Sequence, residues 1–188
     1  RKIIPNCLDT KFWKAFDKNY ARKMLKLPLD KPLLCFGTFN ENNAFHKGAD
    51  LLNAALEKLK NKIPELGIVT FGNANKNDIL FEKFPTYNLG FIQDELLMKA
   101  VYSASDAIAV PSRNESFGQV ASEAMACSRP VVCFDSSGLR DIVDHKVNGY
   151  LAKSFDASDF AMGILWLMDN EKSKLLSEAA RNKVKRLF

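Results

Sequence analysis

The 188-residue sequence lacks long apolar segments and paired cysteine motifs. No apolar run approaches the roughly 18 residues that a membrane-spanning helix needs, and the first residues contain no long apolar stretch of the kind found in a signal peptide. The four cysteines form no C-x-x-C pair, which favours a reducing compartment. These absences lead us to expect a cytoplasmic protein.

Histidine is also scarce. His46 and His145 lie far apart, and neither joins a cluster of cysteines or paired carboxylates, so we predict no metal site. No aromatic-interleaved basic motif and no zinc pattern occurs, and nucleic acid is therefore not an expected partner. No G-x-G-x-x-G follows an apolar run, which argues against a dehydrogenase-type nucleotide domain.

The chain is basic, with a formal net charge of +5. Lysine and arginine alternate with apolar residues near the end of the sequence, a pattern typical of the solvated face of a surface helix. Attraction to an anionic membrane surface, such as the inner face of the cell membrane, is the alternative. The basic residues concerned are Lys172, Lys174, Arg181, Lys183, Lys185 and Arg186.

Short apolar runs alternate with segments of helical periodicity along the chain, which is 47% hydrophobic and 26% charged. The alternation predicts an α/β fold, a Rossmann-like three-layer α/β/α sandwich with a parallel sheet. Ligands of such sheets bind beyond the carboxyl ends of the strands. The runs predicted as strands are 33–36, 68–72, 87–90, 108–110, 131–134 and 149–151.

Two glutamates, Glu115 and Glu123, stand eight positions apart between two of these apolar runs. Ser116 and Gln119 fit an S-x-x-Q capping box, so we expect a helix that is capped by Ser116 and begins one residue later. Free N–H groups at that helix start would bind phosphate or hydroxyl groups. An ordinary helix with one acid at its start and one solvated glutamate is the alternative.

The segment 111–126, with the letters P-S-R-N-E-S-F-G-Q-V-A-S-E-A-M-A, resembles the signature of retaining glycosyltransferases of family 4 (group 1), which have the GT-B fold. The likeness covers almost the whole chain, because further matching motifs occur at residues 4–9, 46–48, 106–112 and 138–151. It implies that residues 1–188 are the C-terminal nucleotide-sugar-binding domain, one half of a GT-B fold, with the N-terminal acceptor domain absent from this chain.

The resemblance also implies roles for single residues, with Glu115 and Lys47 as the catalytic residues. Lys47 would neutralise the donor diphosphate, and Glu115 would contact hydroxyl groups of the donor sugar. Glu123 would bind the ribose hydroxyls. The remaining donor-binding positions are the backbone of Phe117 and Gly118 at the sugar or phosphate, Phe91, Ile92 and Leu96 around the base and ribose, and Thr38 in the phosphate loop.

Three residues carry expectations of their own. We expect Lys47 in the first turn of the helix that contains Leu51 and Leu52, where the helix dipole disfavours a cation and a functional reason is therefore favoured. Asp94 is expected to cap a helix. Arg113 is expected to be a solvated loop arginine, with contact to the acceptor or to the partner domain as the alternative.

The implied activity is retaining transfer of a hexose from a UDP- or GDP-sugar to a glycan or lipid-linked acceptor, in surface polysaccharide biosynthesis and without a metal. The fragment alone is expected to be inactive in transfer. Thr38 stands where the family usually has arginine, and the loop from Phe39 to Phe45 is longer than usual. These departures support the alternative of a catalytically silent nucleotide-sugar-binding or regulatory module. A GT-B-like epimerase would carry a different glutamate and histidine constellation.

Overall fold

A six-stranded parallel sheet forms the centre of the computed structural model, which describes residues 7–38, 44–72, 84–169, 171 and 173–188. The strand order is β3-β2-β1-β4-β5-β6, and each neighbouring pair is parallel. The predicted parallel sheet is therefore confirmed. The strands are β1 Leu33–Thr38, β2 Gly67–Gly72, β3 Thr86–Asn88, β4 Ala107–Val110, β5 Val131–Phe134 and β6 Gly149–Ala152.

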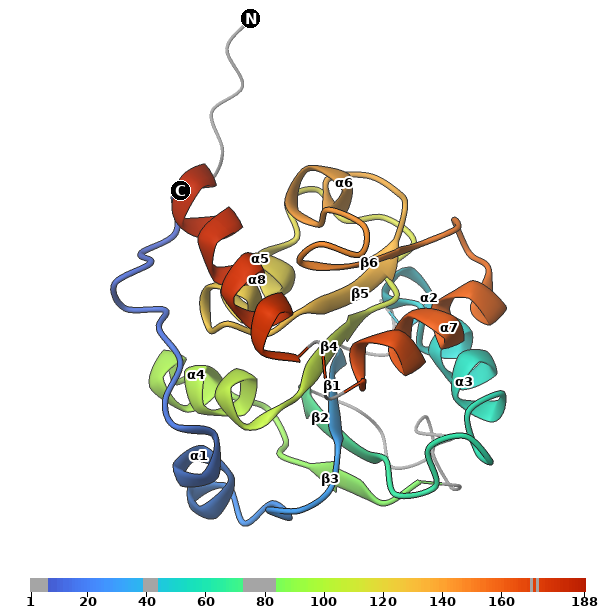
Figure 1. The fold of residues 1–188 in the computed structure, drawn as a ribbon, viewed down its shortest axis with the longest axis horizontal. Coiled ribbons are helices and arrows are strands. Elements are labelled where there is room, and N and C mark those ends of the chain that lie inside the picture. Colours follow the sequence, from blue (N-terminus) through green and yellow to red (C-terminus); the bar gives the residue numbers. More distant parts are fainter. Residues whose placement is uncertain (1–6, 39–43, 73–83, 170, 172) are drawn as a thin grey trace, which may run out of the picture.

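Helices cover both faces of the sheet, as Figure 1 shows, so the three-layer architecture is also confirmed. One face carries α1 Lys18–Met24, α4 Glu95–Ala104, α5 Gln119–Ala126 and α8 Ser173–Leu187. The opposite face carries α3 Ala49–Glu57 and α7 Ala157–Leu167, with the short α2 Ala44–Lys47 just before α3. A second short helix, α6 Leu139–Ile142, follows β5 and packs beside α5.

The strands alternate their side chains between two apolar clusters, one beneath each helical layer. Cys35, Val69 and Ile108 belong to the cluster under α4 and α5, whereas Leu34 and Ile68 belong to the cluster under α3 and α7. Because both faces are covered, β2, β4 and β5 are buried along their full length. This explains why they appear in the sequence as continuous apolar runs.

The amino-terminal edge of the sheet is held by one buried arginine. The Arg22 side chain is 2% exposed and donates to the Asp106 carboxylate at 2.8 Å and to the Ala104 carbonyl at 2.9 Å. Asp106 also accepts from the backbone N–H of Leu33 at 2.7 Å. These bonds join α1 to the starts of β1 and β4, so the polar network lies at the edge opposite to the carboxyl ends of the strands.

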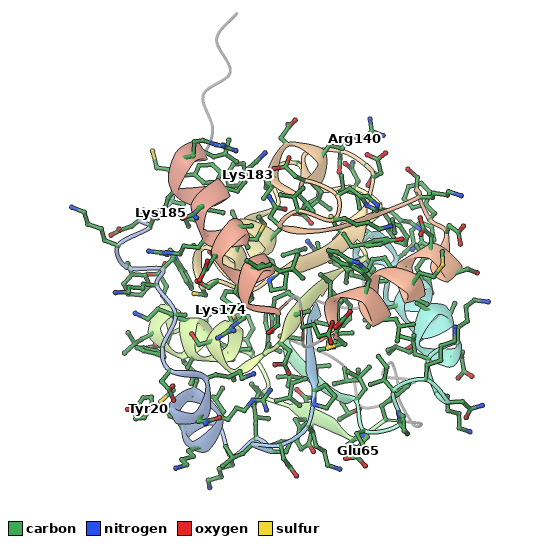
Figure 2. All side chains as sticks on the ribbon, viewed as in Figure 1. Tyr20, Glu65, Arg140, Lys174, Lys183 and Lys185 are labelled. Atoms are coloured by element: carbon green, nitrogen blue, oxygen red, sulfur yellow. The ribbon has the colours of Figure 1, made fainter. Side chains whose placement is uncertain are left out.

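The basic residues of α8 only partly match the expectation of a solvated face. Figure 2 labels three of its lysines along the helix. Lys183 pairs with Asp144 at 2.9 Å, and Arg181 donates to the main-chain carbonyls of Thr10, Trp13 and Ala126. The prediction of a solvated position is thus wrong for these two residues. The reason is that α8 packs on α5, which brings both cations within reach of hydrogen-bond acceptors on neighbouring segments. Lys172 lies outside the described residues.

Within the described part of the chain, no helix has both the length and the apolar character needed to cross a membrane.

Candidate functional site

The strand order reverses between β1 and β4, and this creates the natural ligand position of the sheet. From β1 the chain continues to β2 through α3 on one face, and from β4 it continues to β5 through α5 on the other face. The two connections therefore diverge at the carboxyl edge and leave a crevice between them. The segment after β1 carries Lys47, and the segment after β4 carries Glu115.

Lys47 and Glu115 meet in this crevice. Their side chains, which are 26% and 19% exposed, form an ion pair with 2.9 Å between Nζ and Oε2. A cleft of about 20 Å³ lies against the pair, lined in part by Gly37, Pro111 and Val120. That volume suits about one water molecule, so a larger ligand has to lie on the outer side of the pair. The structure thus brings together the two residues that the sequence proposed as catalytic.

The local setting of Lys47 differs from the prediction of a first helical turn. Lys47 is the last residue of α2, where the helix dipole favours a cation. Gly48 then interrupts the helix with a φ of +70°, and α3 begins at Ala49. A Cβ atom on Gly48 would lie 2.0 Å from the carbonyl oxygen of Pro111. The glycine therefore permits the close approach of the two segments that places Lys47 beside Glu115.

The predicted Ser116 cap is wrong. The cap residue is Gly118, with a φ of +76°, and α5 begins at Gln119. The reason lies in the preceding loop, where the N–H of Glu115 donates to Ser137 Oγ at 3.0 Å and the Glu115 carbonyl accepts from the N–H of Gly138 at 3.1 Å. These bonds tie the Glu115 backbone to the segment after β5, and the left-handed glycine turns the chain only afterwards into the helix.

Phe117 and Gly118 are both used within the protein. The ring of Phe117 packs against Phe188 with centroids 5.5 Å apart. A side chain on Gly118 would collide with Leu139 and Ile142 of α6, at 2.9 and 3.0 Å. The backbone, rather than the Phe117 ring, is thus the part of this loop that remains for contact with a ligand.

Glu123 is buried rather than solvated, which contradicts the alternative interpretation of this residue. It is 7% exposed, and its two carboxylate oxygens accept from the Tyr102 hydroxyl at 3.0 Å and from the Gln119 amide at 2.9 Å. Burial raises the pKa of Glu123 above its ordinary value, although both hydrogen bonds lower it. Each oxygen retains a free lone pair, so the carboxylate can still accept from a hydroxyl group of a ligand.

The expected base and ribose positions follow β3 at the same edge of the sheet. Gly72, at the end of β2, donates its N–H to the carbonyl of Gly90 at 2.8 Å. Phe91 and Leu96 are 56% and 54% exposed, whereas Ile92 is partly buried against the core. Two exposed apolar side chains therefore lie near the carboxyl edge, available to a flat apolar ligand.

The remaining predicted positions are Thr38 with the loop after it, the residues at the start of the chain, and the Asp94 cap. Thr38 is the last residue of β1 and lies opposite Gly72. Residues 39–43 of the long loop and Ile4, Pro5 and Asn6 lie outside the described residues. The predicted cap is confirmed, because Asp94 accepts from the N–H of Leu97 at 2.8 Å. No group of three or more potential metal ligands occurs among the described His, Cys, Asp and Glu residues.

Arg113 contradicts its prediction as a solvated loop residue. Its side chain is 18% exposed and pairs with Asp50 at 2.6 Å. The pairing arises because the loop after β4 runs directly beside the start of α3. Sequence reasoning missed this contact. The one feature that could have indicated it is Asp50, an acidic residue three positions after Lys47 to which no other role was assigned.

These features define a doubly wound α/β domain with a charged site at its topological switch point. The model of the family Glycosyl transferases group 1 matches residues 20–183. The chain therefore belongs to the group 1 family of glycosyltransferases.

Curated relatives agree with this assignment. The chain is 34% identical over 178 residues to the D-inositol 3-phosphate glycosyltransferase of Xylanimonas cellulosilytica, covering 88% of this chain and 41% of the relative. It is 32% identical over 176 residues to the D-inositol 3-phosphate glycosyltransferase of Corynebacterium aurimucosum, covering 85% and 40%. The chain thus spans about two fifths of the length of these relatives.

Solved structures show the same fold. The chain is 29% identical to the sucrose-phosphate synthase of Thermosynechococcus elongatus, with a TM-score of 0.84 over 100% of this chain and 48% of that one. The Anabaena protein HepE, solved with UDP and glucose, has 24% identity and a TM-score of 0.81, over 100% and 53%. The C-terminal domain of the group 1 family protein LpcC from Francisella tularensis has 22% identity and a TM-score of 0.78, over 96% and 97%. This is the Rossmann-like fold of GT-B glycosyltransferases.

Proposed function

We propose that the chain is the C-terminal, donor-binding domain of a retaining glycosyltransferase of family 4, and that it binds a UDP- or GDP-sugar at the crevice between β1 and β4. The observation that carries this proposal is the ion pair between Lys47 and Glu115 at 2.9 Å, formed by segments that meet where the strand order reverses. In the whole protein, a hexose would pass to a glycan or lipid-linked acceptor during surface polysaccharide biosynthesis.

The ion pair supplies the two charges that such a donor needs. Departure of a nucleoside diphosphate develops negative charge, and a fixed ammonium group at that place stabilises it. A diphosphate carries more charge than one carboxylate, so it would draw Lys47 away from Glu115. The freed Glu115 carboxylate would then accept hydrogen bonds from sugar hydroxyls. The proposal includes no metal, because Lys47 is the cation that we assign to the diphosphate.

The rest of the nucleotide would extend along the carboxyl edge. Glu123 would bind the ribose, since its carboxylate is held rigidly by two donors and retains lone pairs. Phe91, Ile92 and Leu96 would border the base and ribose, the backbone of Phe117 and Gly118 would approach the sugar or phosphate, and Thr38 would lie in the phosphate loop. HepE was solved with UDP, and UDP is therefore the first nucleotide to test on this chain, with GDP second.

Transfer requires more than this chain in our proposal. The chain spans about half the length of the matched sucrose-phosphate synthase and HepE chains, and the acceptor would bind to the missing N-terminal domain. The acceptor named for the curated relatives is not assigned to this chain, because the match covers only about two fifths of them. We expect no sugar transfer from UDP-glucose by the 188-residue chain. Transfer at a measurable rate would contradict the two-domain proposal.

A nucleotide panel tests the proposed site. Thermal unfolding of the chain would be followed with UDP, GDP, ADP and CMP, where a ligand at about 100 times its dissociation constant stabilises by about 2.7 kcal/mol. We expect a clear shift with UDP or GDP and a smaller one for Lys47→Ala. Lys185→Ala, at an exposed position of α8, is the matched control and should respond as the unchanged chain does. No shift with any of the four nucleotides would contradict the proposal.

A further inference from the structure

The two segments that carry Lys47 and Glu115 are held together by more than their ion pair. Gly48 lies so close to Pro111 that no side chain fits between them. Lys47 directly precedes Gly48, so its side chain starts next to this backbone contact. An interaction that holds the two segments together therefore also sets the distance from Lys47 to Glu115.

Arg113 makes several interactions of this kind. Its backbone N–H donates to the carbonyl of His46 at 2.8 Å. Its Nη1 donates to the carbonyl of Phe45 at 2.6 Å and to Asp50 Oδ1 at 2.8 Å, and its Nη2 donates to Asp50 Oδ2 at 2.6 Å. The guanidinium carbon also lies 4.0 Å from the centre of the Phe45 ring. One arginine thus grips the chain on both sides of Lys47, at α2 and at α3.

We propose that Arg113 is a positioning residue, whose guanidinium fork clamps the α2–α3 segment to the loop after β4 and so fixes the backbone from which the Lys47 side chain reaches the crevice, where it contacts Glu115 in the free chain and the diphosphate in the complex. The inference rests on the proposed function, because the position of Lys47 matters for a diphosphate ligand.

The geometry requires arginine rather than any cation. The planar guanidinium donates two parallel hydrogen bonds to the Asp50 carboxylate and can also stack on an aromatic ring, whereas an ammonium group is a point charge. The hydrogen bonds from Arg113 lower the pKa of Asp50, so the carboxylate stays ionised at neutral pH. Replacement by lysine keeps the charge of the loop and removes only the fork.

A simple surface salt bridge is the competing explanation. Asp50 is 58% exposed, and exposed ion pairs contribute little to stability. In that case, loss of Arg113 would leave both the fold and the site unchanged. The clamp predicts a different pattern, in which the fold survives and only interactions that use Lys47 weaken.

The experiment compares UDP with uridine on Arg113→Lys and Arg113→Ala. We expect the dissociation constant for UDP to rise about tenfold, the effect of losing one moderately strong ionic contact, and that for uridine to stay the same. Arg140→Ala is the matched control, because Arg140 pairs with Asp135 at 2.8 Å at the same edge of the sheet but is 59% exposed and projects outward (Figure 2). It should leave both constants unchanged.

A second measurement needs no nucleotide. Acetylation of Lys47 in the ligand-free chain, followed by mass spectrometry, should become faster in Arg113→Lys and not in Arg140→Ala. Equal weakening of UDP and uridine, or no change in UDP affinity and Lys47 reactivity, would overturn the clamp. If the unchanged chain binds neither UDP nor GDP, the proposed function fails, and the Lys47 reactivity then decides the clamp separately.

Discussion

Removal of the Tyr102 hydroxyl isolates the hydrogen bond that supports Glu123. Tyr102→Phe keeps the ring and its contacts with Trp13 and Phe71, whose ring centroids lie 5.9 and 6.2 Å away. It deletes only the bond to Glu123 Oε2 at 3.0 Å. Because Glu123 is 7% exposed, water cannot fully replace that donor.

The cost depends on the charge of Glu123. A hydrogen bond to a charged group contributes about 1.5–3 kcal/mol to the free energy of unfolding, and one between neutral groups about 0.5–1.5 kcal/mol. We therefore expect a loss in the higher range at pH values above the raised pKa of Glu123, where the carboxylate is ionised, and in the lower range at pH values below it.

The same result follows from proton binding. Burial raises the pKa of Glu123 in the folded chain, so between its unfolded and folded pKa values the folded chain binds more protons, and stability falls as the pH rises. The neighbouring Glu95 raises the pKa further, and Gln119 opposes the shift. Loss of the Tyr102 donor raises the pKa again, which extends this fall in stability to higher pH.

Urea unfolding over a pH series, compared at one pH above the transition of Glu123 and one below it, measures the effect. Tyr20→Phe is the matched control, because Tyr20 is 60% exposed. This substitution should change the free energy of unfolding by no more than about 0.5 kcal/mol at either pH. A penalty for Tyr102→Phe that is the same at both pH values would refute the reasoning, since it would mean that the hydroxyl does not support the carboxylate charge.

Three further predictions follow from the fold and the site. Arg22→Met should lower the free energy of unfolding by about 3–5 kcal/mol, because it removes the buried partner of Asp106, which keeps only the half-exposed Lys18, together with the donors to four main-chain carbonyls; a loss below about 1 kcal/mol in urea unfolding would contradict this. Gly48→Ala should cost about 2 kcal/mol or more, since it adds a left-handed strain to a collision with the Pro111 carbonyl, and unchanged stability would disprove the close approach. EDTA should leave UDP affinity unchanged in calorimetry; a loss that Mg²⁺ restores would show that a metal takes part.

The sheet was predictable because strands that are buried on both faces appear in the sequence as short apolar runs. Strands covered on both faces, such as β2 and β4, must be apolar along their length. Parallel order then places their carboxyl ends at one edge, where ligands of such sheets bind, whereas Lys47 and Glu115 themselves were indicated by the resemblance to the glycosyltransferase signature. The prediction of the sheet needs only periodicity and handedness, and it does not depend on any particular contact.

The local geometry was not predictable in the same way. The sequence at the start of α5 is compatible with a capping box at Ser116 and with a glycine cap at Gly118. The glycine cap forms because Ser137 and Gly138, which belong to a different strand connection, hydrogen-bond to the backbone of Glu115. The support of Glu123 by Tyr102 and the clamp of Arg113 on Asp50 likewise join residues 21 and 63 positions apart. Such contacts arise from packing between helices and loops, for which a single sequence carries no periodic signal.

The most direct test of the account is a crystal structure of the chain with UDP. We predict that the diphosphate lies at the carboxyl edge between β1 and β4, with the Lys47 ammonium within hydrogen-bonding distance of a phosphate oxygen and a ribose hydroxyl at Glu123. Lys47 should then have left Glu115, its partner at 2.9 Å in the free chain. A nucleotide bound elsewhere on the molecule, or one at this edge without contact to Lys47, would contradict the account.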